Sequence, residues 1–291
     1  MREAFDPHSN DNALFVTSRC NNRCLMCCQP PQADPDAEHL FAHNVRLLQS
    51  APPDLPVLGI TGGEPTLLGE RLVALLEEAH RRLPHTAFHL LSNGRAFSDA
   101  AFVRRVCRAA GDNLFVGIPL HSDYAGDHDL IAGCRGAYEE TLTGLYNLAD
   151  AGVEIELRVV VNRLNYARLP RMADFIFKYL PFVGWTALMA MERTGLSVPN
   201  EAQVWAEPRQ YAPQLRQAVL SLAGWGMGVA VYNVPLCLLP RDCWPYAKQS
   251  ISDWKTAFAP RCEACRAQAQ CCGLFSTSIR PFEGITPILE P

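Results

Sequence analysis

Three closely spaced cysteines, Cys20, Cys24 and Cys27, form the pattern CxxxCxxC directly after a short apolar run at residues 14–16. Three thiolates at this spacing can hold three irons of a cubane cluster and leave the fourth iron without a protein ligand. An open metal position can bind a substrate or cosubstrate, whereas four protein ligands are typical of an electron carrier or a structural site. The spacing therefore indicates chemistry at a metal. A zinc site completed by Cys28 or a distant histidine, and buried thiols without metal, are the alternatives.

Cysteine is frequent in this chain, with 12 among 291 residues. The first eight residues contain no apolar core, so we expect no secretory signal and a cytoplasmic location, where thiols stay reduced. Metal binding then explains the cysteines better than disulfides do. The cysteines form two groups, four at residues 20–28 and six at residues 237–272, while Cys107 and Cys134 are assigned to packing.

Charge and hydropathy argue against two classes of partner. The formal net charge is −4 and the basic residues form no stripe, so nucleic acid is not expected as the main partner. No apolar run approaches the roughly 18 residues of a membrane span. The length suits one sizeable domain with a small appendage.

Short apolar segments alternate with amphipathic segments of helix length along most of the chain. We expect strands at residues 14–17, 57–60, 87–91, 114–118, 154–161, 185–189 and 229–232. Helices are expected at residues 40–49, 72–83, 99–110, 138–150, 169–180 and 211–223, with Ser98 as the N-cap of the third. Six βα repeats in this order predict a parallel sheet with right-handed crossovers. Periodicity alone leaves a barrel and an open doubly wound sheet as alternatives.

A second motif, Gly62, Gly63 and Glu64, follows the second expected strand. Two glycines let a ligand approach the backbone closely, and a carboxylate with nearby carbonyls suits an ammonium group. Both motifs come directly after strand ends, which is where the sites of parallel α/β folds lie. The ordinary alternative is a βα turn followed by a proline that starts a helix.

Together the motifs resemble the radical S-adenosylmethionine (radical SAM) superfamily, whose signature is CxxxCxΦC, with Met26 at the apolar Φ position. The resemblance implies an α/β fold, a partial six-stranded (βα)6 TIM-like barrel at residues 1–225. A small cysteine-rich extension at residues 226–291 would follow it. The resemblance also implies that the three cysteines hold a 4Fe–4S cluster, with S-adenosylmethionine bound at the open iron.

The resemblance implies cofactor contacts around the first motifs. Met26 would pack beside the adenine, or plug the core, and Gly62, Gly63 and Glu64 would bind the amino group of S-adenosylmethionine. Ser92 and Asn93, after the third strand, would contact the ribose or the methionyl part. An ordinary Asn-Gly turn explains this last pair about equally well.

Further contacts are expected at the fifth and sixth strands. Alternation along residues 154–162 predicts that even positions face the barrel interior. Arg158 would there meet the carboxylate of S-adenosylmethionine, with a structural pair to Glu156 as the alternative, and Asn162 would line the site. Met189 follows the sixth strand, where the family surrounds adenine with apolar atoms; core packing explains it equally well.

The second cysteine group contains CxxC at Cys262 and Cys265, followed by Cys271. This run resembles part of the auxiliary-cluster domains called SPASM and twitch, although the complete SPASM set is missing. We choose Cys237 as the remaining ligand of a second, auxiliary 4Fe–4S cluster, and Cys243 and Cys272 are its rivals. A structural zinc site is the alternative.

The segments at residues 232–240, 250–255 and 262–276, together with Gln29, Pro30 and Pro31, resemble the maturases of His-Xaa-Ser peptide-modification systems. This implies a radical SAM enzyme that oxidises or crosslinks a ribosomally made precursor peptide. An electron donor such as flavodoxin or ferredoxin, and a partner radical SAM maturase, would accompany it. The alternatives are a non-catalytic metal-binding module that presents a peptide to another enzyme, and a radical SAM enzyme acting on tRNA or a small molecule.

Overall fold

The computed structural model describes residues 5–6, 9, 11–34 and 36–290, and its strands and helices alternate as the sequence predicts. The strands are β1 (Ala13–Phe15), β2 (Val57–Thr61), β3 (Ala87–Leu91), β4 (Leu114–Pro119), β5 (Glu154–Val161), β6 (Trp185–Ala190), β7 (Gly228–Tyr232), β8 (Ala247–Lys248), β9 (Thr256–Ala257) and β10 (Leu274–Phe275). The helices are α1 (Ala37–Gln49), α2 (Glu70–Arg82), α3 (Ala100–Ala110), α4 (Ala125–Ala132), α5 (Ala137–Asp150), α6 (Leu169–Tyr179), α7 (Glu201–Val204) and α8 (Pro208–Gly224). Most of the first eight residues, on which the expected lack of a secretory signal rests, lie outside the described part.

Strands β1 to β8 form one sheet in sequence order. Pairing is parallel from β1 to β4 and from β6 to β8. The α/β fold is therefore confirmed. The sheet has eight strands, not the six of the expected partial barrel. Strand β7 matches the strand expected at residues 229–232, whereas the short β8 was not predicted, and among the described strands the sheet is not closed into a barrel.

The chain divides into two compact units, each described here by itself. The first comprises Met1–Arg23, Gln29–Pro119 and Cys134–Glu156, and the second comprises Cys24–Cys28, Leu120–Gly133 and Leu157–Pro291. Strand β5 contributes residues to both. The expected domain division between residues 225 and 226 stays a prediction.

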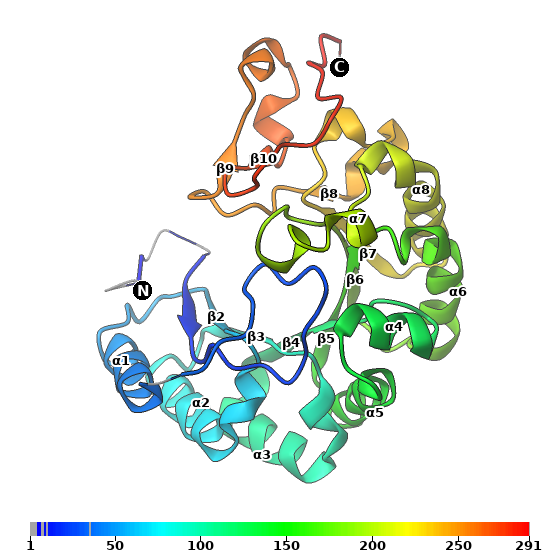
Figure 1. Cartoon of the computed structure of the whole chain (residues 1–291). Coiled ribbons are helices and arrows are strands. Elements are labelled where there is room, and N and C mark those ends of the chain that lie inside the picture. The colour runs from blue at the N-terminus through cyan, green and yellow to red at the C-terminus, as the bar shows by residue number, and fades with distance from the viewer. Residues whose placement is uncertain (1–4, 7–8, 10, 35, 291) are drawn as a thin grey trace. The chain divides into compact units, whose positions relative to one another are not determined.

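In the first unit, helices α1, α2 and α3 accompany strands β1 to β4 (Figure 1). Helix α2 shows the amphipathic principle that predicted these helices, because Leu72, Leu76 and Ala79 are fully buried. Glu78, on its solvent side, pairs with both Arg81 and Arg82. Burial of one apolar stripe thus fixes which face of the helix meets the sheet.

Helix α3 begins one residue later than the sequence predicts. Its N-cap is Asp99, whose carboxylate accepts the Ala101 amide at 2.8 Å, while Ser98 ends the preceding 3-10 helix η2 (Arg95–Ser98). Both residue types cap helices well, so sequence alone could not choose between neighbours.

In the second unit, α6 and α8 pack together beside β6 and β7 (Figure 1). Leu215, Val219 and Leu222 form the buried face of α8. Along β5, the odd positions 155, 157, 159 and 161 are buried and Arg158 is half-buried, as the expected alternation requires. No helix among the described residues is both long and apolar enough to span a membrane.

Candidate functional site

Cys20 lies in the loop after β1, in the first unit. The Asn22 amide donates a hydrogen bond to Cys20 Sγ at 3.3 Å. Burial raises the pKa of the Cys20 thiol, while that amide and the nearby Arg95 guanidinium oppose the rise. The residue also lines an open pocket together with Gln32 and Leu67. An accessible sulfur with an amide donor and a nearby cation suits a thiolate metal ligand.

Arg95, which sequence reasoning did not single out, fastens this loop to the end of β3. Its Nη1 donates to the Asn21 carbonyl and to Asn22 Oδ1, each at 2.8 Å. Its Nε donates to Glu140 of α5 at 2.5 Å. Asn93 adds a bond from Nδ2 to Asn21 Oδ1 at 2.6 Å. The backbone next to Cys20 is thus held by one guanidinium and one amide.

The glycine motif lies directly against the same loop. The Gly63 amide donates to the Thr17 carbonyl and the Glu64 amide to the Arg19 carbonyl, each at 2.7 Å. A Cβ on Gly63 would lie 2.3 Å from the Arg19 oxygen, and one on Gly62 would lie 2.4 Å from the Thr17 oxygen. Only glycine permits this approach, because the obstructing atoms belong to the backbone. The structure therefore brings the first unit's parts of the two motifs together.

The Glu64 carboxylate points into the protein and is fully buried. Its Oε1 accepts the Thr66 amide at 3.0 Å, the Thr66 hydroxyl at 2.6 Å and the Ser92 hydroxyl at 2.8 Å. Its Oε2 accepts the Asn93 amide at 2.6 Å. Burial raises the pKa of Glu64, and these donors counteract the rise. The predicted residues Glu64, Ser92 and Asn93 thus form one cluster, in which the carboxylate shapes the ends of β2 and β3.

The other two cysteines of the first motif lie in the second unit. The Cys27 amide donates to the Cys24 carbonyl at 3.0 Å, which closes a turn. The Cys27 carbonyl accepts the Leu196 amide at 2.9 Å, and the Leu25 amide donates to the Ile131 carbonyl at 2.9 Å. Segments that follow β4 and β6 therefore hold this short loop.

Met26 is buried in a cluster with Ile131, Met191 and Val204. This placement matches the core alternative, and its expected contact with adenine stays a prediction. Met189 is half-buried on β6, in register with Tyr232 of β7, and its expected role also stays a prediction.

The fifth strand ends in a turn that uses its own polar side chain. Asn162 Oδ1 accepts the Leu164 amide at 2.9 Å, and its Nδ2 donates to the Val160 carbonyl at 3.0 Å. Asn162 therefore shapes the loop after β5. The Arg158 carbonyl accepts a hydrogen bond from the Leu120 amide at 3.0 Å.

Glu156, the alternative partner considered for Arg158, lies beside a histidine in the first unit, and its expected pair with Arg158 stays a prediction. Its Oε2 is 2.9 Å from Nε2 of His89, whose ring stacks on Phe115 with centroids 4.2 Å apart. The neighbouring Gly117 leaves room for this pair, since a Cβ there would lie 3.0 Å from His89 Nε2. The sequence offered no signal for this contact, because the residues come from different strands.

Polar residues after β4 in the second unit also bond internally. The His121 amide donates to His128 Nδ1 at 3.1 Å, and the two rings stack with centroids 5.3 Å apart. Burial lowers the pKa of His121 to about 3 and that of His128 to about 4. Asp123 binds Arg168 through both oxygens at 2.8 Å. Helix α4, which the sequence did not predict, is tied to β4 by this histidine pair.

Cys28, named above as a possible zinc ligand, is exposed. Protein atoms nevertheless surround the sulfur enough that desolvation, followed by the Glu192 charge, raises its pKa. The Glu192 carboxylate in turn accepts a hydrogen bond from Lys255 Nζ at 3.1 Å. The position after Cys27, the last predicted ligand of the first motif, thus lies near charged groups of the second unit.

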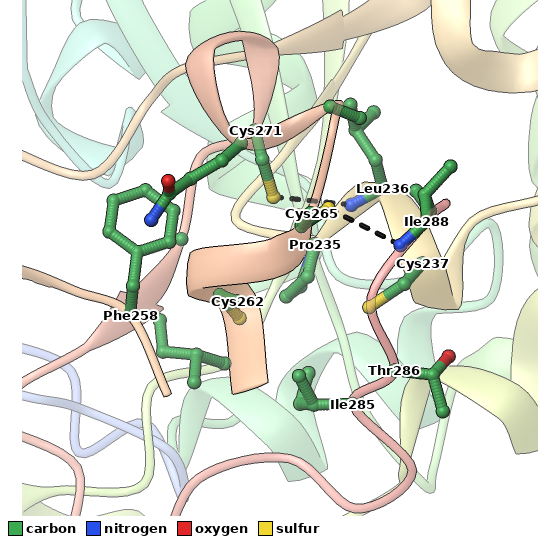
Figure 2. Close-up of a pocket in the computed structure, with 14 residues that line it drawn as sticks. Pro235, Leu236, Cys237, Phe258, Cys262, Cys265, Cys271, Ile285, Thr286 and Ile288 are labelled. Carbon is green, nitrogen blue, oxygen red and sulfur yellow. Dashed lines mark hydrogen bonds between the residues drawn. The ribbon is translucent and has the colours of Figure 1, made fainter. Parts of the chain in front are cut away.

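One pocket of the second unit gathers all four predicted ligands of the second cysteine group, namely Cys237, Cys262, Cys265 and Cys271. Figure 2 shows their sulfurs around a common space. The cavity between the lining residues is small, with a volume of about 20 Å³. The rest of the lining is mostly apolar, with Leu236 and Phe258 among it. The rivals Cys243 and Cys272 are buried and do not line this pocket.

Backbone amides point at two of these sulfurs. Leu236 donates to Cys271 Sγ at 3.5 Å and Ile288 to Cys265 Sγ at 3.4 Å (Figure 2). The Cys272 thiol, with further help from backbone amides, lowers the pKa of Cys271 to about 6.

Four thiols with amide donors are a donor set that fits an iron–sulfur cluster or zinc. The side chains are not arranged as a complete metal site, however. In the part of the chain that the structure describes, no three His, Cys, Asp or Glu side chains lie close enough together to bind a single metal ion.

Comparison with known proteins identifies a family for residues 14–176 of the chain. A family model described as the Radical SAM superfamily matches residues 14–176. Fe-coproporphyrin III synthase of Methanosarcina barkeri is 24% identical over 200 residues, which cover 64% of this chain and 48% of that protein. The 7-carboxy-7-deazaguanine synthase of Methanothermobacter thermautotrophicus is 34% identical over 157 residues, covering 51% and 60%. PqqA peptide cyclase of Granulibacter bethesdensis is 25% identical over 161 residues, covering 55% and 41%.

Solved structures share the fold at low sequence identity. Streptococcus suis SuiB bound to S-adenosylmethionine matches with a TM-score of 0.60 and 12% identity, over 75% of this chain and 49% of that one. The protein anSMEcpe with bound S-adenosylmethionine and a peptide matches with a TM-score of 0.52 and 18% identity, over 75% and 62%. The chain thus spans about half the length of the first relatives it matches.

Proposed function

The chain belongs to the radical SAM superfamily, and from that membership we propose that it cleaves S-adenosylmethionine reductively and abstracts hydrogen from a substrate. The family implies a 4Fe–4S cluster and S-adenosylmethionine, and Cys20, Cys24 and Cys27 are the residues that would hold the cluster. When bound, the cluster supplies the electron that splits S-adenosylmethionine into methionine and a 5'-deoxyadenosyl radical.

The observation that carries this proposal is the contact between the two motifs in the first unit. The bonds from Gly63 to Thr17 and from Glu64 to Arg19 place the glycine backbone beside the loop of Cys20. Backbone carbonyls of such a glycine turn would accept the cosubstrate's ammonium group. Glu64 would keep the turn rigid through its bonds to Ser92 and to the backbone.

We also propose that the four-cysteine pocket holds an auxiliary 4Fe–4S cluster. The support is that the four predicted ligands, and neither rival cysteine, line it. Such a centre would accept the electron that remains on a substrate after hydrogen abstraction, which makes the net reaction an oxidation. Structural zinc is the competing occupant.

The proposed substrate is a ribosomally made peptide that becomes oxidised or crosslinked. The support is the similarity to a peptide cyclase and the resemblance of the second cysteine group to His-Xaa-Ser maturases. A flavodoxin or ferredoxin would deliver the electron, and a partner maturase would share the peptide. Relatives that make tetrapyrroles and deazaguanine keep a small-molecule substrate as the second candidate.

Replacing one ligand of the first motif tests the activity. Protein reconstituted anaerobically with iron and sulfide should form 5'-deoxyadenosine from S-adenosylmethionine and dithionite, and Cys24→Ala should abolish this product, because two thiolates cannot retain the cluster. Cys107→Ala is the control, since that half-buried cysteine lies on α3 and not in either motif. Undiminished product from Cys24→Ala would contradict the ligand assignment. A wild-type protein that makes none would favour a non-catalytic binding module.

A synthetic peptide with several His-Xaa-Ser repeats tests the substrate class. We expect it to raise 5'-deoxyadenosine formation and to lose two hydrogens per modification, as measured by mass spectrometry. If the peptide mass stays unchanged while S-adenosylmethionine is still cleaved, the peptide proposal fails and the cleavage activity stands.

A further inference from the structure

A single backbone segment forms part of the wall of the four-cysteine pocket, and we infer that this segment is a working part of the metal site. The segment comprises residues 284–290 and is called the strap below. The inference rests on the proposed auxiliary site and goes beyond its four thiolates. It assigns the strap two tasks, which are donating a hydrogen bond to the Cys265 sulfur and controlling the exchange of metal with solvent.

The strap supplies part of the wall and one of the donors. Ile285, Thr286 and Ile288 line the pocket, and Ile285 is buried. The Ile288 amide donates to Cys265 Sγ at 3.4 Å (Figure 2). Amide bonds to ligand sulfurs draw off negative charge and hold the thiolates in place, so they tune both the affinity and the potential of a bound metal.

Three arginines fasten the strap by its backbone carbonyls. Arg209 of α8 donates to the Gly284 carbonyl at 2.7 Å, Arg261 to the Ile285 carbonyl at 3.1 Å, and Arg241 to the Glu290 carbonyl at 3.2 Å. These arginines come from separate segments of the second unit. Because the charged donors bind carbonyls on both sides of Ile288, its amide is held facing the Cys265 sulfur.

Gly284 is the position where the strap can be disturbed most selectively. Its φ of +71° lies in the left-handed region that favours glycine. A Cβ there would lie 2.6 Å from the Arg209 guanidinium carbon. Alanine at this position therefore strains the strap and displaces one of its three fastenings without touching a cysteine.

The test measures how fast metal leaves the pocket. The parent is the full chain with Cys20, Cys24 and Cys27 changed to Ala, so that only the second cysteine group can bind metal. After anaerobic reconstitution with iron and sulfide, a chelator is added and iron release is followed by absorbance. Ile288→Pro removes the amide donor to Cys265, and we expect release to quicken about tenfold or more, the usual cost of losing an outer partner of a metal ligand.

Two comparisons distinguish the loss of the amide hydrogen bond from general damage to the fold. Ile288→Ala keeps the amide, so its release rate should rise less than that of Ile288→Pro. Gly284→Ala should also quicken release, whereas Gly224→Ala, where an added Cβ meets open space, should match the parent. Thermal unfolding of each variant without metal checks that the fold is retained.

Two outcomes overturn the inference, and they differ from each other. Equal release rates for the parent, Ile288→Pro and Gly284→Ala would show that the strap plays no part in a real metal site. A parent that binds neither iron nor zinc would overturn both the strap and the auxiliary site. The second outcome does not decide whether the chain cleaves S-adenosylmethionine, because that activity is measured on protein with an unmutated first motif.

Discussion

At the scale of single residues, Arg95 is the side chain that most directly supports the first motif without being a predicted ligand. Its guanidinium bonds to Asn21, Asn22 and Glu140, and its charge acts on Cys20. The three cysteines and the glycine motif were visible in the sequence because their spacing carries the chemistry. An arginine after an Asn-Gly turn carries no such pattern, so its role emerged only from its contacts.

Replacing Arg95 should weaken cluster retention. Arg95→Ala removes two charge-assisted hydrogen bonds from the loop of Cys20, and we expect about 10- to 100-fold faster loss of iron to a chelator, with a higher KM for S-adenosylmethionine. Arg95→Lys should recover little, because an ammonium group cannot reproduce the guanidinium fork. The control is Arg105→Ala, which breaks a pair with Glu70 and a contact with the Phe102 ring and leaves the loop of Cys20 untouched. Unchanged iron retention and KM in Arg95→Ala would contradict this role.

At the scale of elements, most strands and helices lie within a few residues of their predicted bounds, and β3 and β5 match them. Helix α4 was missed because its eight residues carry no clear apolar stripe. Its position depends on His128, whose Nδ1 accepts the His121 amide of the β4 end. That acceptor must be unprotonated, so the docking of α4 is sensitive to pH.

The histidine pair predicts acid sensitivity. Burial lowers the pKa values of His121 and His128 to about 3 and about 4, from 6.5. Between those values and 6.5 the unfolded chain binds more protons than the folded chain, so stability falls as the pH is lowered. From pH 7 to pH 5 each histidine should remove about 2 kcal/mol from the free energy of unfolding.

Urea unfolding at pH 7 and pH 5 measures this loss. His128→Gln keeps a side-chain oxygen that can accept the His121 amide and cannot be protonated in this range, so its stability should depend less on pH. His85→Gln, at an exposed position, should retain the full dependence of the unmutated chain. An equal pH dependence in His128→Gln and the unmutated chain would refute the assignment.

At the scale of the whole molecule, two separate cysteine groups predict two clusters. Anaerobically reconstituted protein should contain about eight irons per chain, and Cys262→Ala combined with Cys265→Ala should leave about four. The doubly substituted protein should still cleave S-adenosylmethionine, because its first motif is intact. Iron and sulfide analysis together with zinc determination checks this. About four irons and one zinc in the unmutated protein would identify the second group as a structural zinc site.

The sequence by itself determined the α/β alternation and both motifs, because periodicity and thiol spacing are properties of the chain's order. The choice of Cys237, Cys262, Cys265 and Cys271 as ligands followed from a family resemblance and stays a prediction. The tertiary structure alone decided that these four cysteines share a pocket and that the sheet extends to eight strands. It also revealed the hydrogen bond from Arg95 to the loop of Cys20 and the hydrogen bond from the strap to a cysteine of the pocket. Those features join segments that are far apart along the chain, and no local pattern records which distant backbone a side chain will meet.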